Sequence, residues 1–204
     1  MYLELYKDIF FKFFIIIDPI GYTLIFLSVT KDLDKEIKNK IAWRAICIGL
    51  FIQIFYLLTG KYLLEFIGIN SSSMKIIGGL SLLKTSYMII YQIDADYNEV
   101  TNENSLKLAI SPLATVILAG PGTLTTLIIE SQKVEDLLEY LIIIFSLFSV
   151  LMICLIGSLF TNYISKINKD IIHIITIMIG VLLASLSITF IINGLNEFKY
   201  NDII

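Results

Sequence analysis

Hydrophobic residues in this chain form six long blocks, separated by short segments that carry most of the charged and turn-forming residues. Each block has about 20 residues, the length that a helix needs to cross the hydrocarbon core of a bilayer. Within the blocks the apolar residues are nearly continuous, rather than spaced at every third or fourth position. The blocks run approximately over Ile9–Thr30, Ile41–Leu64, Ser73–Gln92, Leu106–Ile129, Leu137–Thr161 and Ile171–Leu195.

The six blocks are predicted to be transmembrane α-helices. Lipid offers no hydrogen-bond partners to the backbone, so only helices and closed barrels span a bilayer, and the alternating pattern of barrel strands is absent. No connection is long enough to form a soluble domain. We therefore expect an all-α membrane protein with six transmembrane helices in a single transmembrane domain, residues 1–204. The connections are Lys31–Lys40, Gly68–Ser72, Asp94–Ser105, Glu130–Asp136 and Ser165–Asp170.

Composition agrees with this class and excludes others. The chain is 57% hydrophobic and 16% charged, whereas soluble domains carry about 25% charged residues. A net charge of -3 without a basic stripe argues against a nucleic-acid partner. Cys47 and Cys154 lie within expected spans and are best interpreted as buried apolar side chains rather than a disulfide or metal pair. With His173 as the only histidine and no hydrolase or nucleotide-binding motif, we expect no metal, no cofactor and no enzymatic activity.

Charge also predicts the orientation in the membrane. Glu4 and Asp8 are atypical of a signal peptide, so the first block is expected to remain as a span. Six spans place both termini on one side, which holds six Lys and Arg residues against eight on the other. Because the positively charged side faces the cytoplasm, the termini are predicted to be periplasmic or extracellular.

Two blocks are interrupted by proline near their centres. Asp18-Pro19-Ile20-Gly21 lies about ten residues, or roughly 15 Å of helix, into the first block, and Gly120-Pro121-Gly122 lies similarly deep in the fourth. Proline lacks an N–H and clashes with the preceding turn, so helices 1 and 4 are expected to break near the midplane. Asp or Gly followed by Pro is typical of an N-cap and first helical residue. The alternative is that both prolines only kink a packed scaffold.

The two halves of the chain share these features. A shift of 102 residues superposes Pro19 on Pro121, and it also matches Thr, Asp and Gly positions. Three spans per half would insert the halves in opposite directions, and inverted repeats with a broken helix in each half are typical of transporters. We therefore predict two inverted three-helix repeats, over residues 1–95 and 103–197 approximately. The other polar or glycine matches are Thr23 with Thr125, Asp34 with Asp136, and Gly78 with Gly180.

Two motifs surround the prolines: Ile17-Asp18-Pro19-Ile20-Gly21 in the first block, and Ala119-Gly120-Pro121-Gly122-Thr123 in the fourth. They resemble the first-span and fourth-span motifs of the MarC family of integral membrane proteins, and the second motif is the more specific. Gly78-Gly79-Leu80 is similar to that family's third span. The resemblance extends over almost the whole chain. It departs at Leu24 and Val116, where the family often has a second proline in each broken span.

The resemblance implies six spans and a bacterial-type inner membrane. Some relatives are assigned as carriers of small neutral amino acids. This adds a substrate class to what the residues indicate by themselves.

The candidate site surrounds the two prolines. A carboxyl group near the bilayer centre costs about 2.5–3.5 kcal/mol on an insertion scale. Asp18 is therefore expected to cap the second half-helix, and to carry a proton or bind a substrate ammonium as further options. Small residues let the backbone approach a ligand and threonine hydroxyls both donate and accept, although interhelical hydrogen bonds explain the threonines equally well. The predicted substrate-binding residues are Asp18, Pro19, Gly21, Thr23, Gly120, Pro121, Gly122, Thr123, Thr125 and Thr126.

Lys84 lies about a dozen residues into the third block. It is either a buried charge partner for Asp18 or a lysine that snorkels to the interface. Gln53, in the middle of the second block, is expected to face the bundle interior.

The leading hypothesis is a secondary transporter of small neutral solutes, with amino acids as the favoured class and proton coupling through Asp18 as an option. Its expected partners are the lipid bilayer and a small-molecule solute. The alternative is a non-transporting membrane scaffold or stress-related accessory protein. Substrate identity, transport direction and oligomeric state do not follow from the sequence.

Overall fold

The computed structural model describes residues 2–31, 33–91, 109–134, 136–161 and 169–201, and these residues are helical with no strand among them. The all-helical class is thus confirmed. The helices are α1 (Tyr2–Ile17), α2 (Pro19–Val29), α3 (Lys35–Ile67), α4 (Ser71–Ile90), the π-helix η2 (Ile110–Leu118), α5 (Pro121–Lys133), α6 (Leu137–Leu159) and α8 (Lys169–Asn201).

Four helical segments in the described part of the chain are long and apolar enough to cross a membrane: Tyr2–Val29, Lys35–Ile67, Leu137–Leu159 and Ile172–Lys199. The third and fourth expected spans are helical too, but they do not belong to this group. α4 contains Lys75, Lys84 and several serines, which lower its hydropathy. The fourth expected span is divided into η2 and α5, neither of which is long enough alone.

Several predicted helix ends are wrong by a turn or more. α3 begins at Lys35 within the expected first connection, and α8 continues to Asn201 beyond the expected end of the sixth block. α5 continues to Lys133, so Glu130 lies in a helix and not in a connection. Lys and Glu occur at these ends, and both are good helix formers, so the helices continue beyond the apolar blocks.

Gly68 ends α3 in the way that glycine commonly ends helices. Its φ is 77°, in the left-handed region where a Cβ is unfavourable. Its N–H donates to the carbonyl of Glu65, and the N–H of Ile69 donates to the carbonyl of Leu64 at 2.9 Å. These bonds satisfy carbonyls that the last turn leaves free, and they return the chain directly into α4.

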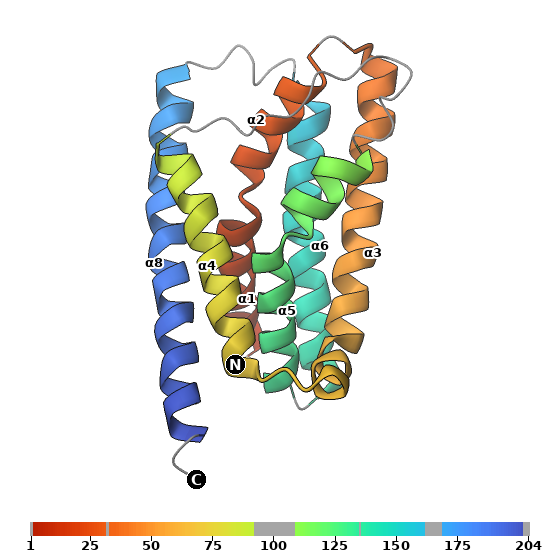
Figure 1. Ribbon diagram of the computed structural model, residues 1–204. Coiled ribbons are helices and arrows are strands. Elements are labelled where there is room, and N and C mark those ends of the chain that lie inside the picture. The colour runs from red at the N-terminus through yellow and green to blue at the C-terminus, as the bar shows by residue number, and fades with distance from the viewer. Residues whose placement is uncertain (1, 32, 92–108, 135, 162–168, 202–204) are drawn as a thin grey trace.

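The bundle consists of a six-element body and a two-helix arm (Figure 1). In the body, the broken helix α1–α2 packs on α6, the broken helix η2–α5 packs on α3, and α3 also contacts α6. The core between them includes Phe13, Tyr22, Phe26, Leu118 and Leu147, all of which are buried. The arm is the pair α4 and α8, which pack chiefly on each other and reach the body through α5 and α1.

Glycines set the close approach of the two arm helices. A Cβ on Gly79 of α4 would lie 2.8 Å from the carbonyl oxygen of Ser187 in α8 and 2.6 Å from a side-chain carbon of Ile191. A Cβ on Gly194 of α8 would lie 2.8 Å from the carbonyl oxygen of Ser72 in α4. Backbone atoms cannot move aside as a flexible side chain does, so these glycines let the arm helices touch, as small residues commonly do between membrane helices.

Gly79→Ala should therefore separate α4 from α8 and lower the apparent melting temperature of the detergent-purified protein, with overpacking costing about 1–3 kcal/mol. Leu80→Ala is the matched control, because Leu80 is the next residue along α4 and is exposed. An unchanged melting temperature for Gly79→Ala would show that the arm does not depend on this contact.

Candidate functional site

The first break is made by a single residue, Asp18. Its backbone is left-handed, with φ 47° and ψ 75°, and among the described residues no other non-glycine has a positive φ. Its N–H donates to the carbonyl of Phe14 in α1 at 3.1 Å, while its carbonyl accepts from the N–H of Tyr22 in α2 at 2.8 Å. Asp18 thus ends one helix and begins the next. Asp is among the few side chains that tolerate this conformation, which still stores about 1–3 kcal/mol of strain.

The predicted N-cap role of Asp18 is confirmed. Oδ1 accepts from the N–H of Gly21 at 3.0 Å, and Pro19 occupies the first helical position. A Cβ on Gly21 would lie 2.2 Å from Oδ2 of the same carboxylate. Only glycine at position 21 therefore leaves room for the capping carboxylate, and the two residues form one unit.

The second break is also present, but it is built differently. η2 ends at Leu118, Gly120 is extended with φ -64° and ψ 163°, and α5 begins at Pro121. No side chain in the described part of the molecule caps the amides of the first turn of α5. One half-helix therefore has an acidic cap, and the N-terminus of the other lacks a side-chain acceptor.

A carbonyl at the C-terminal end of η2 accepts a hydrogen bond from a side chain of another helix. The Nε2 atom of Gln53 in α3 donates to the carbonyl oxygen of Leu118 at 2.8 Å, and Gln53 is fully buried. The prediction that Gln53 faces the bundle interior is confirmed. Its contact with the break was not predicted, because the two residues are 65 positions apart in the chain.

The π-helical conformation of η2 was not predicted either. The N–H of Ala119 donates to the carbonyl of Ala114, five residues earlier, at 2.9 Å. The hydroxyl of Thr115 likewise bonds to the carbonyl of Ile110. A π-helix is wider than an α-helix and is frequent at functional sites, but no local sequence signal distinguishes it.

Two predicted site threonines bond within their own helices. The hydroxyl of Thr23 donates to the carbonyl of Pro19 at 2.7 Å, and that of Thr126 donates to the carbonyl of Gly122 at 2.9 Å. Both side chains are buried. These bonds satisfy carbonyls in the first turns after the breaks, so both threonines have a structural role whatever else they do.

The remaining predicted residues pack across helices. A Cβ on Gly78 of α4 would lie 2.5 Å from Cγ2 of Thr125, and one on Gly122 would lie 2.3 Å from a methyl of Leu82 in α4. Thr123 is buried as well. Residues beside the second break therefore form much of the contact between the body and the arm.

The breaks differ in exposure. Asp18 and Pro19 are buried, Gly21 is half-buried, Gly120 is buried and Pro121 is exposed.

Lys84 is exposed on α4 and forms no ion pair with Asp18, whose carboxylate accepts from the N–H of Gly21 in its own turn. The structure thus does not bring together the charge pair that the sequence allowed.

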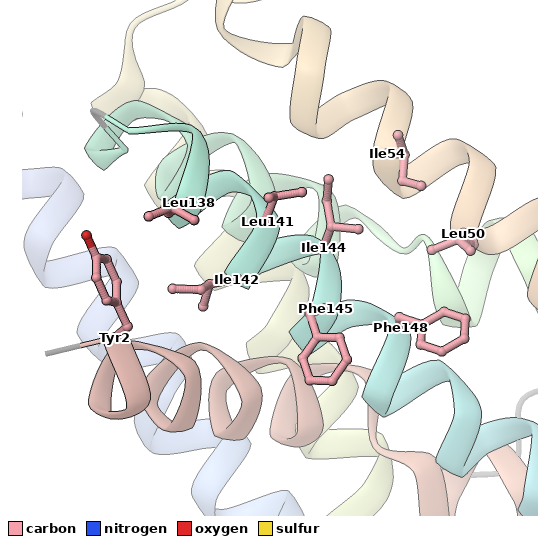
Figure 2. Close-up of a pocket in the computed structure, with 9 residues that line it drawn as sticks. All are labelled: Tyr2, Leu50, Ile54, Leu138, Leu141, Ile142, Ile144, Phe145 and Phe148. Atoms are coloured by element: carbon pink, nitrogen blue, oxygen red, sulfur yellow. The ribbon is translucent and has the colours of Figure 1, made fainter.

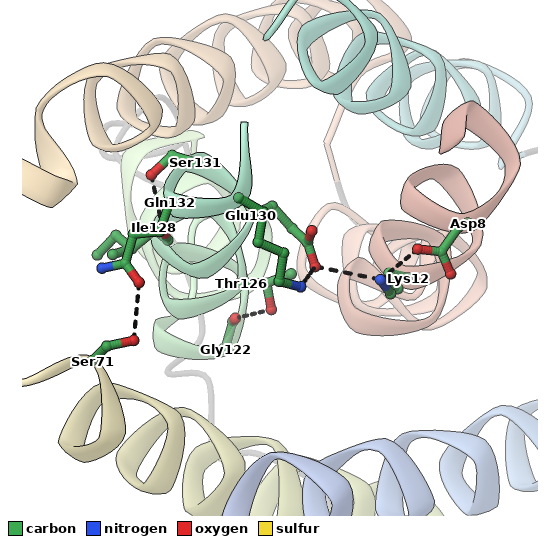
Figure 3. A network of polar contacts seen from close by, with 10 residues as sticks. Asp8, Lys12, Ser71, Gly122, Thr126, Ile128, Glu130, Ser131 and Gln132 are labelled. Carbon is green, nitrogen blue, oxygen red and sulfur yellow. Dashed lines mark hydrogen bonds and ion pairs between the residues drawn. The ribbon is translucent and has the colours of Figure 1, made fainter. Parts of the chain in front are cut away.

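An ionic cluster surrounds the buried carboxylate of Glu130 at the end of the bundle that holds both termini (Figure 3). Oε1 of Glu130 in α5 lies 3.4 Å from Nζ of Lys12 in α1 and 3.0 Å from Nζ of Lys133. Glu130 is 6% exposed, and Lys12 also pairs with Asp8 at 2.5 Å. A polar pocket of about 160 Å³ adjoins the cluster. This cluster was not predicted, because Glu130 was assigned to a connection.

A larger groove of about 630 Å³ lies between α3 and α6, with Tyr2 at one end (Figure 2). Its lining is apolar, and it includes Leu50, Ile54, Leu141 and Phe145. Neither this groove nor the polar pocket lies at a helix break. Apolar surface of this kind is expected on a membrane protein.

The long apolar helices, the two interrupted helices and the internally satisfied break carbonyls define a polytopic α-helical integral membrane protein. A family model described as MarC family integral membrane protein matches residues 3–198. The chain therefore belongs to the MarC family, as its motifs had indicated.

Relatives of similar length are found in bacteria and archaea. A UPF0056 membrane protein of Buchnera aphidicola subsp. Baizongia pistaciae is 32% identical, with 94% of this chain and 93% of the relative covered. One of Archaeoglobus fulgidus is 29% identical, with 96% and 94% covered. One of Methanocaldococcus jannaschii is 28% identical, with 91% and 93% covered. No solved structure matches the chain.

Gly21→Ala should displace the Asp18 carboxylate and lower the apparent melting temperature, because loss of an N-cap costs about 0.5–2 kcal/mol. The test is a double-mutant cycle with Asp18→Gly, which removes the carboxylate and relieves the left-handed strain. Gly21→Ala should then cost much less in the Asp18→Gly background than in the wild type. Equal losses in both backgrounds would contradict the contact.

Glu130→Gln should lower the melting temperature by leaving Lys12 and Lys133 without their shared carboxylate, at a cost of about 1–3 kcal/mol. Glu36→Gln is the control, since Glu36 pairs with Lys40 at 2.7 Å on the exposed start of α3. The control change should be negligible. Similar effects of the two substitutions would show that the buried cluster contributes no more than a surface pair.

Proposed function

We propose that this protein is a secondary transporter of small neutral solutes, with amino acids as the favoured class, and that the solute binds at the two helix breaks. The observation that carries the proposal is the pairing of two interrupted helices: α2 has an acidic cap, and the first-turn amides of α5 have no side-chain cap among the residues that the structure describes. Irregular backbone deep in a membrane protein is tolerated where it is packed in protein or lines a cavity, and it commonly forms transporter sites.

The arrangement of helices supports an inverted repeat. In Figure 1 the chain ascends through α1 and α2 and descends through η2 and α5; α3 and α6 run in opposite directions, and so do α4 and α8. α1 contacts α5, while α2 contacts η2. Both contacts fit two antiparallel helices whose breaks lie at a similar level. With six spans, the two halves are then related as in inverted-repeat carriers.

A small zwitterion complements the chemistry of the two breaks. The first-turn amides of α5 and the positive end of its dipole suit a carboxylate. Asp18 Oδ1 holds the N–H of Gly21, and the second carboxylate oxygen suits a substrate ammonium or a transported proton. In this proposal Asp18 is both the cap and the coupling residue.

Alternating access would occur between the arm and the body. The contact of α4 with α5 includes Gly78 on Thr125 and Leu82 on Gly122, directly after the second break. Contacts between small residues allow helices to slide with little change in volume. Movement of the arm would therefore open or cover the break region.

The MarC relatives carry membrane-protein names only. The proposal places the chain in the inner membrane, with both termini periplasmic or extracellular.

One observation favours the alternative of a non-transporting membrane scaffold or accessory protein. The hydroxyls of Thr23 and Thr126 are satisfied within their helices, and Gly122 is in contact with Leu82. A scaffold would use the same bonds and contacts to pack its breaks.

Flux of labelled glycine and alanine into proteoliposomes, with and without a pH gradient, tests the transporter. We expect uptake above that of empty vesicles, and we expect Asp18→Asn to reduce it at least tenfold and to remove its response to the gradient. Asn keeps an N-cap oxygen, so the fold should persist.

Asp136→Asn is the matched control, because Asp136 is an exposed N-cap at the start of α6 and makes no side-chain cap bond. It should leave flux unchanged. Absence of flux for every small solute tried would favour the scaffold, whereas flux unaffected by Asp18→Asn would remove Asp18 from the mechanism.

A further inference from the structure

Gln53 carries a buried acceptor that has no partner. Its Nε2 atom is fixed by the 2.8 Å bond to the carbonyl of Leu118, which also fixes the orientation of the amide. Its Oε1 atom accepts no hydrogen bond from any residue that the structure describes, although the side chain is fully buried. Buried side-chain acceptors are nearly always satisfied, so this oxygen calls for a donor.

The register of α3 against the second broken helix places Gln53 beside the break. Gly49 of α3 contacts Leu118, and Gly60 of α3 contacts Ile128. α3 and η2–α5 run in the same direction in Figure 1. Gln53 is one turn beyond Gly49, or about 6 Å along the helix. It is therefore level with the first turn of α5.

The first turn of α5 supplies the complementary groups. Pro121 has no N–H, and the N–H of Leu124 donates to the carbonyl of Gly120 at 3.0 Å. The amides of Gly122 and Thr123 precede the first intrahelical bond, and no side chain caps them. Two donors on α5 and one acceptor on α3 are thus at the same level of the second break.

We propose that Gln53 is a substrate-binding and specificity-determining residue, which accepts a hydrogen bond from the ammonium group of a small α-amino acid whose carboxylate binds the first-turn amides of α5. This inference rests on the proposed transport function and assigns the residue that recognises the ammonium group of the substrate. In an α-amino acid the two charged groups are attached to one carbon, which suits an acceptor and amide donors at one level of two helices in contact, α3 and α5. Asp18 remains available for the proton.

The arrangement has a consequence for selectivity. A short carboxylic acid such as propionate satisfies the α5 amides but leaves the Gln53 oxygen unpaired. Sites that hydrogen-bond a substrate group discriminate strongly against analogues that lack it. Alanine and propionate differ in the amino group alone, so they isolate the contribution of Gln53.

The test is competition of unlabelled alanine and propionate against uptake of labelled alanine in proteoliposomes. In the wild type, alanine should compete at least tenfold better than propionate. Gln53→Met removes the acceptor at similar size, and this preference should fall at least fivefold. Gln53→Asn keeps a polar amide, so it provides a folded variant if the methionine variant does not accumulate; its shorter side chain should reduce the preference as well.

Thr59→Val is the control, since Thr59 lies on α3 and bonds within its own helix to the carbonyl of Phe55. It should keep the wild-type preference. Retention of the full preference by Gln53→Met or Gln53→Asn would overturn the assignment of Gln53 while leaving transport intact. Absence of alanine and glycine uptake by the wild type would instead overturn the proposed function.

Discussion

The constraint on which this structure depends is that an interrupted helix in lipid must satisfy its free backbone groups from within the protein. Each break exposes carbonyls at the end of one half-helix and amides at the start of the next. At the first break, Asp18 meets both needs locally, through its own backbone and its carboxylate. At the second, Gln53 reaches from another helix to hold the carbonyl of Leu118.

These two solutions make the breaks chemically different although the sequence repeat makes them equivalent in position. The carboxylate of Asp18 places a negative charge at the start of α2, whereas no described side chain caps the N-terminus of α5, which keeps its attraction for an anion. A site built from one acidic and one positive end suits a solute with both charges. Two identical breaks would instead favour a solute of one sign. The difference between the two breaks therefore supports a zwitterion as the proposed solute.

The sequence predicts whatever depends on a residue and its near neighbours. Pro19 and Pro121 fix the breaks because proline lacks an N–H, and Asp18 is recognisable as a cap because it precedes proline. The Gln53–Leu118 hydrogen bond could not be predicted from the sequence, since it depends on how α3 packs against η2. Glu130 was assigned to a connection because its charge resembles that of a loop, yet two lysines satisfy it within the bundle.

The position of the arm connects packing to the proposed mechanism. α4 and α8 bind each other through glycines that meet backbone atoms, so they are expected to move as a unit. Their contact with the body is smaller, and on α5 it involves Gly122 and Thr125, just beyond the second break. The ion pair of Lys12 and Glu130 joins α1 to α5 within the body. A body that holds both helix breaks, with a two-helix arm packed against it, is a division that suits the proposed access from alternating sides.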